Sequence, residues 1–587
     1  MLCIWFLICY KDKVKLWCSE YIQGYRINNV TYFKLVVIMC FFMISIGRAN
    51  VSLDWDSAWY GTRSHFVLDN ISGIFDNLKM VGCVFVYPKG YETYALPLNW
   101  DVSYSFLYAG NIIFGMWILY IAYKICRLFL DSEKSLWGAL LVSAIPGIMN
   151  MTIAAKPDIM TLFVQLFMIY FSLLFVKEKK TFYLELVLSG YIFSQTLKTT
   201  SAVFSTSILL ALVFVSVIYK IRPCEKQPHF IILFSILDLV FIWYRTFLLT
   251  GIPATSIWGK FFTLLGMKDN YPYNSGQISQ FRNENIFDKT IVNESILRIK
   301  EFLFAPNSAD TDHIIIAWGT TLCTFMIIIM IIWSIWNIRH CLFKIINTPE
   351  VCFSGLLVIG EFAGCLMSLW IGVKPDGNYF MLYYSVTIIF GIIYLQSFLV
   401  KEKLLSKSIL MGILIGFIPL NMIFTGGTNW AWASSFNKID WYNIGYYNHQ
   451  KEFKEEMCQR GCVDIYEVMS SDPTNRIYAL AEHPFIEQVP CVIESETSVT
   501  AWGNVEIISS VENFVQFVKF SDYDYIYIAP EYVKKDSKEY RYLCQLFKED
   551  MVFSLMTENG HMLLKMGNTQ NKYDSGELLN QFLEMFI

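Results

Sequence analysis

The chain has 587 residues, of which 55% are hydrophobic, 17% aromatic and only 16% charged. Soluble domains of this length do not have that balance, so the composition indicates a polytopic membrane protein. The net charge of -4 is small and the basic residues lie in short scattered clusters, which excludes the electrostatic footprint of a nucleic-acid-binding protein.

Stretches of roughly 17 to 25 mainly apolar residues predict about eleven transmembrane helices. The predicted spans are residues 31–47, 105–125, 136–154, 159–176, 182–197, 201–219, 230–250, 314–336, 351–372, 380–400 and 408–425.

Lysine and arginine concentrate in alternate connections between these spans. The clusters lie at residues 11–15, 127–134, 177–180, 220–226, 339–344 and 401–407. By the positive-inside rule these segments face the cytoplasm, and so does the N-terminus. The other loops and the C-terminal region are then expected outside, in a multi-pass protein of the cell membrane.

The first outer loop, residues 48–104, is rich in Trp, Tyr and Asp. It carries Asp54, Trp55 and Asp56 just beyond the first predicted span. Carboxylates are costly near hydrocarbon, so two of them at a membrane boundary indicate a functional site. The alternative is that one of these aspartates only caps a short helix.

Two very short connections on the same side of the membrane carry charge as well. Lys156, Pro157 and Asp158 join the third and fourth predicted spans, and Lys198 follows the fifth. A pair of lysines can hold a phosphate, while an aspartate can take a proton from an attacking hydroxyl. The combination suits transfer of a group from a lipid phosphate to an acceptor. The alternatives are a capping role for Asp158 and snorkelling of the two lysines.

The second outer loop, residues 251–312, is long and polar in its middle, through Asn270, Tyr273, Asn274, Ser275 and Gly276. Long loops of this kind are commonly lids or binding elements, so we expect this loop to be the part that moves.

Beyond residue 425 the charge rises and short β-like stretches alternate with helical patterns. The predicted strands are residues 476–480, 489–493, 523–529 and 561–565, and the predicted helices are 447–460, 509–519 and 537–547. The pattern predicts a membrane domain over residues 1–425 and an extracytoplasmic α/β domain over 426–587. We expect the α/β domain to act as a scaffold or to grip the acceptor.

The order and sidedness of three motifs resemble those of GT-C fold glycosyltransferases. The motifs are Asp56-Ser57-Ala58-Trp59-Tyr60, Lys156-Pro157-Asp158 and Lys198-Thr199-Thr200. The most similar members are bacterial aminoarabinose transferases of lipid A and protein mannosyltransferases. The resemblance implies an integral membrane enzyme that moves a sugar, with inversion, from a polyprenyl-phosphate donor to an extracytoplasmic acceptor. That acceptor is a cell-surface glycan, a lipid or a protein.

The resemblance also implies roles for individual residues. It makes Asp56 the base, with Asp54 sharing that role or orienting a divalent metal, and Asp158 the second acidic position. It places Lys198 at the donor phosphate. The remaining residues expected to bind substrate are Lys156, Tyr60, Arg63, Lys374 and Tyr379.

Two positions depart from the family pattern. Ser57 stands where many members have Glu, and Asn378 precedes Tyr379 where many have Arg. Lys374 is four residues earlier and is the expected substitute for that arginine. No cofactor is assigned, and metal use stays open.

Two other functions are compatible with the sequence. A transporter or flippase of lipid-linked glycans is also polytopic, and Asp238, Arg245 and Glu361 fall within or near predicted spans, as ionisable residues of transporters do. A polymerase or ligase of surface polysaccharide differs in its acceptor more than in its chemistry.

Overall fold

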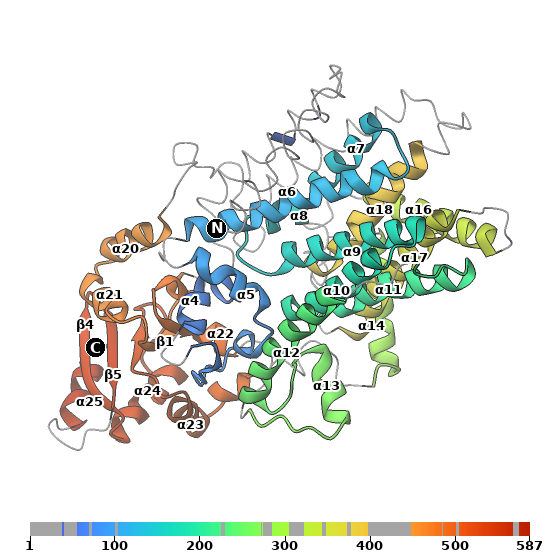
Figure 1. The fold of residues 1–587 in the computed structure, drawn as a ribbon. Coiled ribbons are helices and arrows are strands. Elements are labelled where there is room, and N and C mark those ends of the chain that lie inside the picture. The colour runs from blue at the N-terminus through green and yellow to red at the C-terminus, as the bar shows by residue number, and fades with distance from the viewer. Residues whose placement is uncertain are drawn as a thin grey trace.

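The structure is a computed structural model. It describes residues 34, 38–39, 56–69, 73–99, 104–224, 229–271, 273, 285–304, 322–342, 348–372, 377–396, 448–483, 485–500, 504–567 and 575–586. A bundle of long helices occupies one side of the molecule, and a mixed α/β unit occupies the other (Figure 1).

The bundle consists of apolar helices. They are α6 (Ser105–Arg127), α9 (Asp158–Glu178), α10 (Thr181–Leu197), α11 (Ser201–Ile218), α12 (Phe230–Thr250), α16 (Leu322–Leu342), α17 (Pro349–Ile371) and α18 (Met381–Tyr394). Among the described residues, six helical segments are long and apolar enough to cross a membrane. The predicted spans over 408–425 and most of 31–47 lie outside the described residues.

One predicted span is wrong as a continuous helix. Residues 136–154 form two shorter helices, α7 (Ser132–Ser143) and α8 (Pro146–Met151). Proline has no N–H to donate, and its ring disfavours helical geometry in the residue before it. Ile145 accordingly adopts an extended conformation, with φ -71° and ψ 118°, and α8 begins at Pro146.

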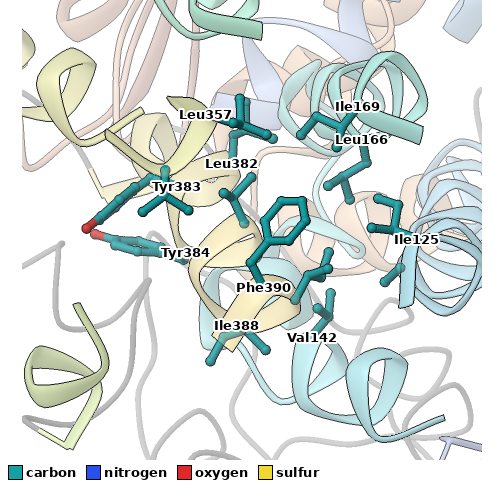
Figure 2. Close-up of a cluster of buried hydrophobic side chains, with 14 of the residues drawn as sticks. Ile125, Val142, Leu166, Ile169, Leu357, Leu382, Tyr383, Tyr384, Ile388 and Phe390 are labelled. Atoms are coloured by element: carbon teal, nitrogen blue, oxygen red, sulfur yellow. The ribbon is translucent and has the colours of Figure 1, made fainter. Parts of the chain in front are cut away.

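Helix α18 lies at the centre of the bundle. All its residues from Met381 to Ile393 are buried. Figure 2 shows Leu382 and Phe390 of this helix among side chains from four neighbouring helices. A helix that is apolar on every side is an interior helix. It is preceded directly by the short 3-10 helix η6 (Gly377–Phe380), so Asn378 and Tyr379 are attached to the buried central helix of the bundle.

The first outer loop is ordered into short helices between the bundle and the α/β unit. They are η1 (Asp56–Ala58), η2 (Gly61–Arg63), α4 (Ser64–Leu68), η3 (Gly73–Phe75), η4 (Cys83–Val86), α5 (Gly90–Ala95) and η5 (Leu96–Leu98). In this loop Met80 and Phe85 pack in one apolar cluster with Leu249 of α12 and Val492 of the α/β unit. The loop therefore joins the two halves of the molecule.

The second outer loop contributes helices α13 (Ile257–Leu264) and α14 (Lys289–Phe304). Of its predicted polar middle, Asn270 and Tyr273 are described, and residues 274–276 lie outside the described residues.

The α/β unit contains a five-stranded sheet in the order β2-β1-β3-β5-β4. Its strands are β1 (Arg476–Leu480), β2 (Val492–Ser495), β3 (Tyr525–Ile528), β4 (Val552–Glu558) and β5 (His561–Met566). Strand β1 pairs in parallel with β2 and β3, whereas β5 is antiparallel to β3 and β4. Strand β4 escaped prediction because only its first residue is buried, which leaves no alternating apolar pattern.

Helices cover both faces of this sheet. They are α20 (His449–Gln459), α21 (Val463–Ser470), α22 (Glu496–Thr500), α23 (Val511–Ser521), α24 (Lys538–Lys548) and α25 (Ser575–Glu584). Along β1, Tyr478 packs with Phe514 of α23 on one face, and Ile477 packs with Phe453 of α20 on the other. This alternation is the period of two expected of a strand buried on both sides. The predicted domain boundary at residues 425 and 426 lies outside the described residues.

Candidate functional site

The start of the first outer loop docks on the connection between α8 and α9. Gly61 N donates to Ala155 O at 2.9 Å, and Ala155 N donates to Ser57 Oγ at 2.7 Å. A Cβ at position 61 would lie 2.7 Å from both Ala155 Cβ and Ala155 O, so only glycine permits these two segments of the backbone to approach this closely. The docking brings Asp56 next to Lys156.

Asp56 and Lys156 form an ion pair. Lys156 Nζ lies 2.7 Å from Asp56 Oδ2; the lysine side chain is 1% exposed and the aspartate 32%. From α6, Asn111 Nδ2 donates to the backbone oxygens of Ala154 and Lys156 and so holds the connection in place. A lysine buried in this way is held by its partner carboxylate and does not snorkel to water. Asp56 keeps access to solvent.

Asp158 and Lys198 form a second pair. Lys198 Nζ lies 2.5 Å from Asp158 Oδ1, with side-chain exposures of 18% and 4%. Asp158 is the first residue of α9, whose N-cap Pro157 makes no side-chain capping bond, while Lys198 directly follows α10. The observed partner of the Asp158 carboxylate is thus the lysine. Lys156 of the first ion pair and Asp158 of the second are separated by Pro157 alone, so the two ion pairs are held close together by the backbone.

The second pair lies on the wall of a pocket with about 340 Å³ of empty space, open to solvent. We call it the polar pocket; its lining includes Asp158, Gln165, Lys198, Ser201, Asn378 and Tyr379. Lys198 Nζ lies 4.3 Å from the centre of the Tyr379 ring, a cation–π distance. Asn378 is 5% exposed and its Oδ1 has no hydrogen-bond partner among the described residues. An ammonium group has three N–H donors, so Lys198 can serve Asp158 and a ligand at the same time.

The structure does not bring all the predicted site residues to this pocket. Tyr60 and Arg63 line a different cavity, of about 430 Å³, between the first outer loop and the α/β unit. Arg63 lies 3.3 Å from Glu487 and donates to the backbone oxygen of Ile493, so its charge fastens the two halves of the molecule together. Asp54 and Lys374 lie outside the described residues.

Glu487 is a buried charge that sequence reasoning missed. Burial alone raises its pKa, but the charges of His483 and Arg63 outweigh burial and lower the pKa to about 2 from 4.5. Ser495 supports the carboxylate by donating from its N, at 2.9 Å, and from its Oγ, at 2.7 Å. No local pattern marks Glu487, because its partner Arg63 is 424 positions away in the sequence.

The pKa of Glu487 gives a testable pH dependence. The pKa of Glu487 is lower in the folded state than in the unfolded state. The ionised carboxylate therefore stabilises the folded protein fully above about pH 4.5, and this contribution is lost as the pH falls through about 2. We expect Glu487→Gln to destabilise the protein by on the order of 3 kcal/mol at neutral pH, with the difference from the wild type shrinking steadily below pH 4.5. Thermal unfolding in detergent across this range measures it. A difference that does not change with pH would contradict the pairing.

The described residues do not form a divalent-cation site. No group of three or more His, Cys, Asp or Glu side chains gathers in the part of the chain that the structure describes. Asp56 and Asp158 each have a lysine ammonium against the carboxylate, which repels a metal ion.

Residues 101–244 match the family of dolichyl-phosphate-mannose-protein mannosyltransferases. This segment contains Lys156, Asp158 and Lys198. The oligosaccharyltransferase of Archaeoglobus fulgidus in its apo form is similar over 87% of this chain and 71% of that one, at 12% identity and a TM-score of 0.50.

The chain has the GT-C fold. The same Archaeoglobus fulgidus enzyme in complex with Zn and sulfate also matches, at 12% identity and a TM-score of 0.50, over 86% of this chain and 69% of that one. ArnT from Cupriavidus metallidurans in the apo state matches at 11% identity and a TM-score of 0.45, over 92% of this chain and 99% of that one. No curated protein matches the sequence.

The predicted resemblance to GT-C membrane glycosyltransferases is confirmed, and so is the predicted fold class of a helical membrane protein with a C-terminal α/β unit. The number of membrane spans stays a prediction, and so does the side of the membrane on which each loop between them lies.

Proposed function

We propose that this protein is a glycosyltransferase that moves a sugar from a polyprenyl-phosphate donor to an acceptor outside the cytoplasm, with inversion. The observation that carries the proposal is the pair of linked carboxylate–lysine contacts, one reaching solvent through Asp56 and the other lining the polar pocket through Lys198. The match of residues 101–244 to a family of mannosyltransferases supports the same reaction class.

In this proposal Lys198 binds the donor phosphate. As the bond between the sugar C1 and the phosphate oxygen breaks, negative charge grows on the leaving polyprenyl phosphate. A fixed ammonium near that oxygen stabilises the transition state more than the ground state. Asp158 holds the Lys198 side chain against the pocket wall, and the Tyr379 ring supports it from a second direction.

Asp56 is then the base. The acceptor hydroxyl attacks C1 from the face opposite the leaving phosphate, its proton passes to Asp56, and one displacement inverts the configuration. Asp56 suits this role because its side chain is partly open to solvent, while Lys156 fixes one of its oxygens. Its Oδ1 accepts no hydrogen bond from the described residues, so this oxygen is available to accept the proton of the acceptor hydroxyl.

Two of the three charges that favoured a transporter, Arg245 and Glu361, have structural partners, whereas Oδ2 of Asp238 in α12 is buried without a hydrogen-bond partner among the described residues. Arg245 of α12 donates to the backbone oxygens of Ile74 and Phe85 and so anchors the first outer loop. Glu361 of α17 accepts a hydrogen bond from Ser207 of α11. The contacts of Arg245 and Glu361 join neighbouring elements, so these two charges do not support the transporter alternative. A surface-polysaccharide polymerase or ligase would use the chemistry proposed here with another acceptor.

The direct test is incubation of the purified protein with a panel of radiolabelled polyprenyl-phosphate sugars, followed by measurement of released polyprenyl phosphate. We expect one donor to be cleaved by the wild type and not by Asp56→Asn. Transport of intact lipid-linked sugar into proteoliposomes, without release of the phosphate, would support a flippase and refute the proposal.

The proposed topology can be tested with two native cysteines. Cys224, between α11 and α12, and Cys458, in α20, are both exposed. The alternating basic clusters place Cys224 in the cytoplasm and Cys458 outside. We therefore expect a membrane-impermeant maleimide to modify Cys458 and not Cys224 in intact cells, and both after solubilisation, as mapped by mass spectrometry. The reverse pattern would invert the whole topology and place Asp56 and Lys198 on the cytoplasmic side.

A further inference from the structure

Side-chain hydrogen bonds form a continuous chain from the polar pocket to the second outer loop. Gln165 of α9 lines the pocket, and its Nε2 donates to Ser205 Oγ of α11 at 3.2 Å. The hydroxyls of Ser205 and Ser194 lie 3.2 Å apart, and Gln195 Nε2 donates to Ser194 Oγ at 2.9 Å. Finally, Gln195 Oε1 accepts from the indole Nε1 of Trp258, in α13, at 3.1 Å.

The donors and acceptors of this chain have one consistent assignment. A serine hydroxyl has a single proton, and that of Ser194 is donated to the backbone oxygen of Tyr191 at 2.7 Å. Ser194 Oγ must then accept from Gln195 and also from Ser205. Ser205 in turn accepts from Gln165. The direction of every bond follows, so the chain is a satisfied network in the helical bundle.

Ser194, in the middle of the network, also holds the turn that carries Lys198. Its backbone oxygen accepts from Lys198 N at 3.2 Å and from Ser201 Oγ at 3.1 Å. Lys198 itself has left the helical conformation, with φ -151° and ψ 114°. The bonds to Ser194 thus anchor the turn to the end of α10, and displacement of Ser194 would move the lysine ammonium.

The second outer loop contacts both halves of the molecule. Its first part is closed by a bond from Asn270 N to Thr250 O at 2.7 Å, and Trp258 packs there against Trp243 of α12, with ring centres 6.2 Å apart. The next part reaches the α/β unit, where the Tyr273 ring lies 5.2 Å from Phe520. The loop therefore contacts α10 and α12 through Trp258 and the α/β unit through Tyr273.

We propose that Trp258 and Gln195 are positioning residues for donor binding. The bond between Trp258 and Gln195 holds α13 against α10 and fixes the position of Ser194. Ser194 in turn holds the turn from which Lys198 reaches the phosphate. The inference rests on the proposed function, because it takes Lys198 as the phosphate-binding group. If Trp258 had a purely structural role, it would hold α13 in place without changing the affinity of the polar pocket for phosphate.

The chain offers a matched pair of substitutions for the test. Trp258→Phe removes an indole N–H that has a partner. Trp243→Phe removes, from the same aromatic cluster, an N–H that is buried without a partner among the described residues. The measurement is the Kd of farnesyl phosphate for the purified full-length protein in detergent, by titration calorimetry. We expect Trp258→Phe to raise Kd about three- to twentyfold and Trp243→Phe to change it less than about twofold.

Two further variants show whether the effect passes through the proposed link. Gln195→Met breaks the same bond from the other side and also removes the bond from Gln195 to Ser194, so it should raise Kd at least as much as Trp258→Phe, and the double variant should be no worse than Gln195→Met. Added to Lys198→Ala, Trp258→Phe should change Kd less than about twofold. If Lys198→Ala binds like the wild type, the proposed function fails. If Lys198→Ala is weak but Trp258→Phe equals Trp243→Phe, or if the effects of Trp258→Phe and Lys198→Ala add, only this inference is overturned.

Discussion

Asp56→Asn is expected to lower turnover about 100- to 10,000-fold, the usual contribution of a positioned base, while leaving donor binding nearly intact. Asparagine keeps the size of the side chain and an oxygen that Lys156 can still bind, but it cannot take the proton of the acceptor hydroxyl. The measurement is release of polyprenyl phosphate per enzyme molecule at saturating donor, alongside the Kd of farnesyl phosphate.

The ion pair with Lys156 calls for a second variant. Asp56→Asn leaves a buried ammonium without its counter-charge, which by itself destabilises a protein. Asp56→Asn combined with Lys156→Met removes both charges and should recover thermal stability but not turnover. Recovery of turnover in the double variant would show that Asp56 only neutralises Lys156. Full activity of Asp56→Asn together with loss of activity in Asp54→Asn would show that Asp54, two residues earlier, is the base.

The short connections explain why much of this site could be predicted from sequence. Lys156 and Pro157 directly precede Asp158, the first residue of α9, and residues 198–200 form the whole connection between α10 and α11. These residues must therefore lie at helix ends on one side of the bundle. The pairing itself was not predictable in this way. The sequence suggested two lysines sharing one phosphate, whereas each lysine contacts its own aspartate, and that depends on how η1 docks against Ala155.

Other features lie beyond local sequence patterns. The pairing of Arg63 with Glu487 joins the first outer loop to the α/β unit, and neither residue belongs to a periodic pattern that points to the other. Hydrophobic runs predicted the long helices well because a lipid-facing or interior helix needs little more than apolar length. The break before Pro146 is different, because the proline was visible in the sequence and its effect on Ile145 follows from its ring.

Lys198→Ala should weaken binding of farnesyl phosphate by about 1.5 to 3 kcal/mol, the range for a charged hydrogen bond, or about 10- to 150-fold in Kd. Part of this loss could come from Asp158, which is 4% exposed and would be left facing the phosphate without its counter-charge. Lys198→Ala with Asp158→Ala separates the two causes by titration calorimetry. Binding that stays weak in the double variant assigns the phosphate contact to the ammonium. Affinity restored to the wild-type value would mean that Lys198 only shields Asp158, and unchanged affinity in Lys198→Ala alone would remove the lysine from the donor site.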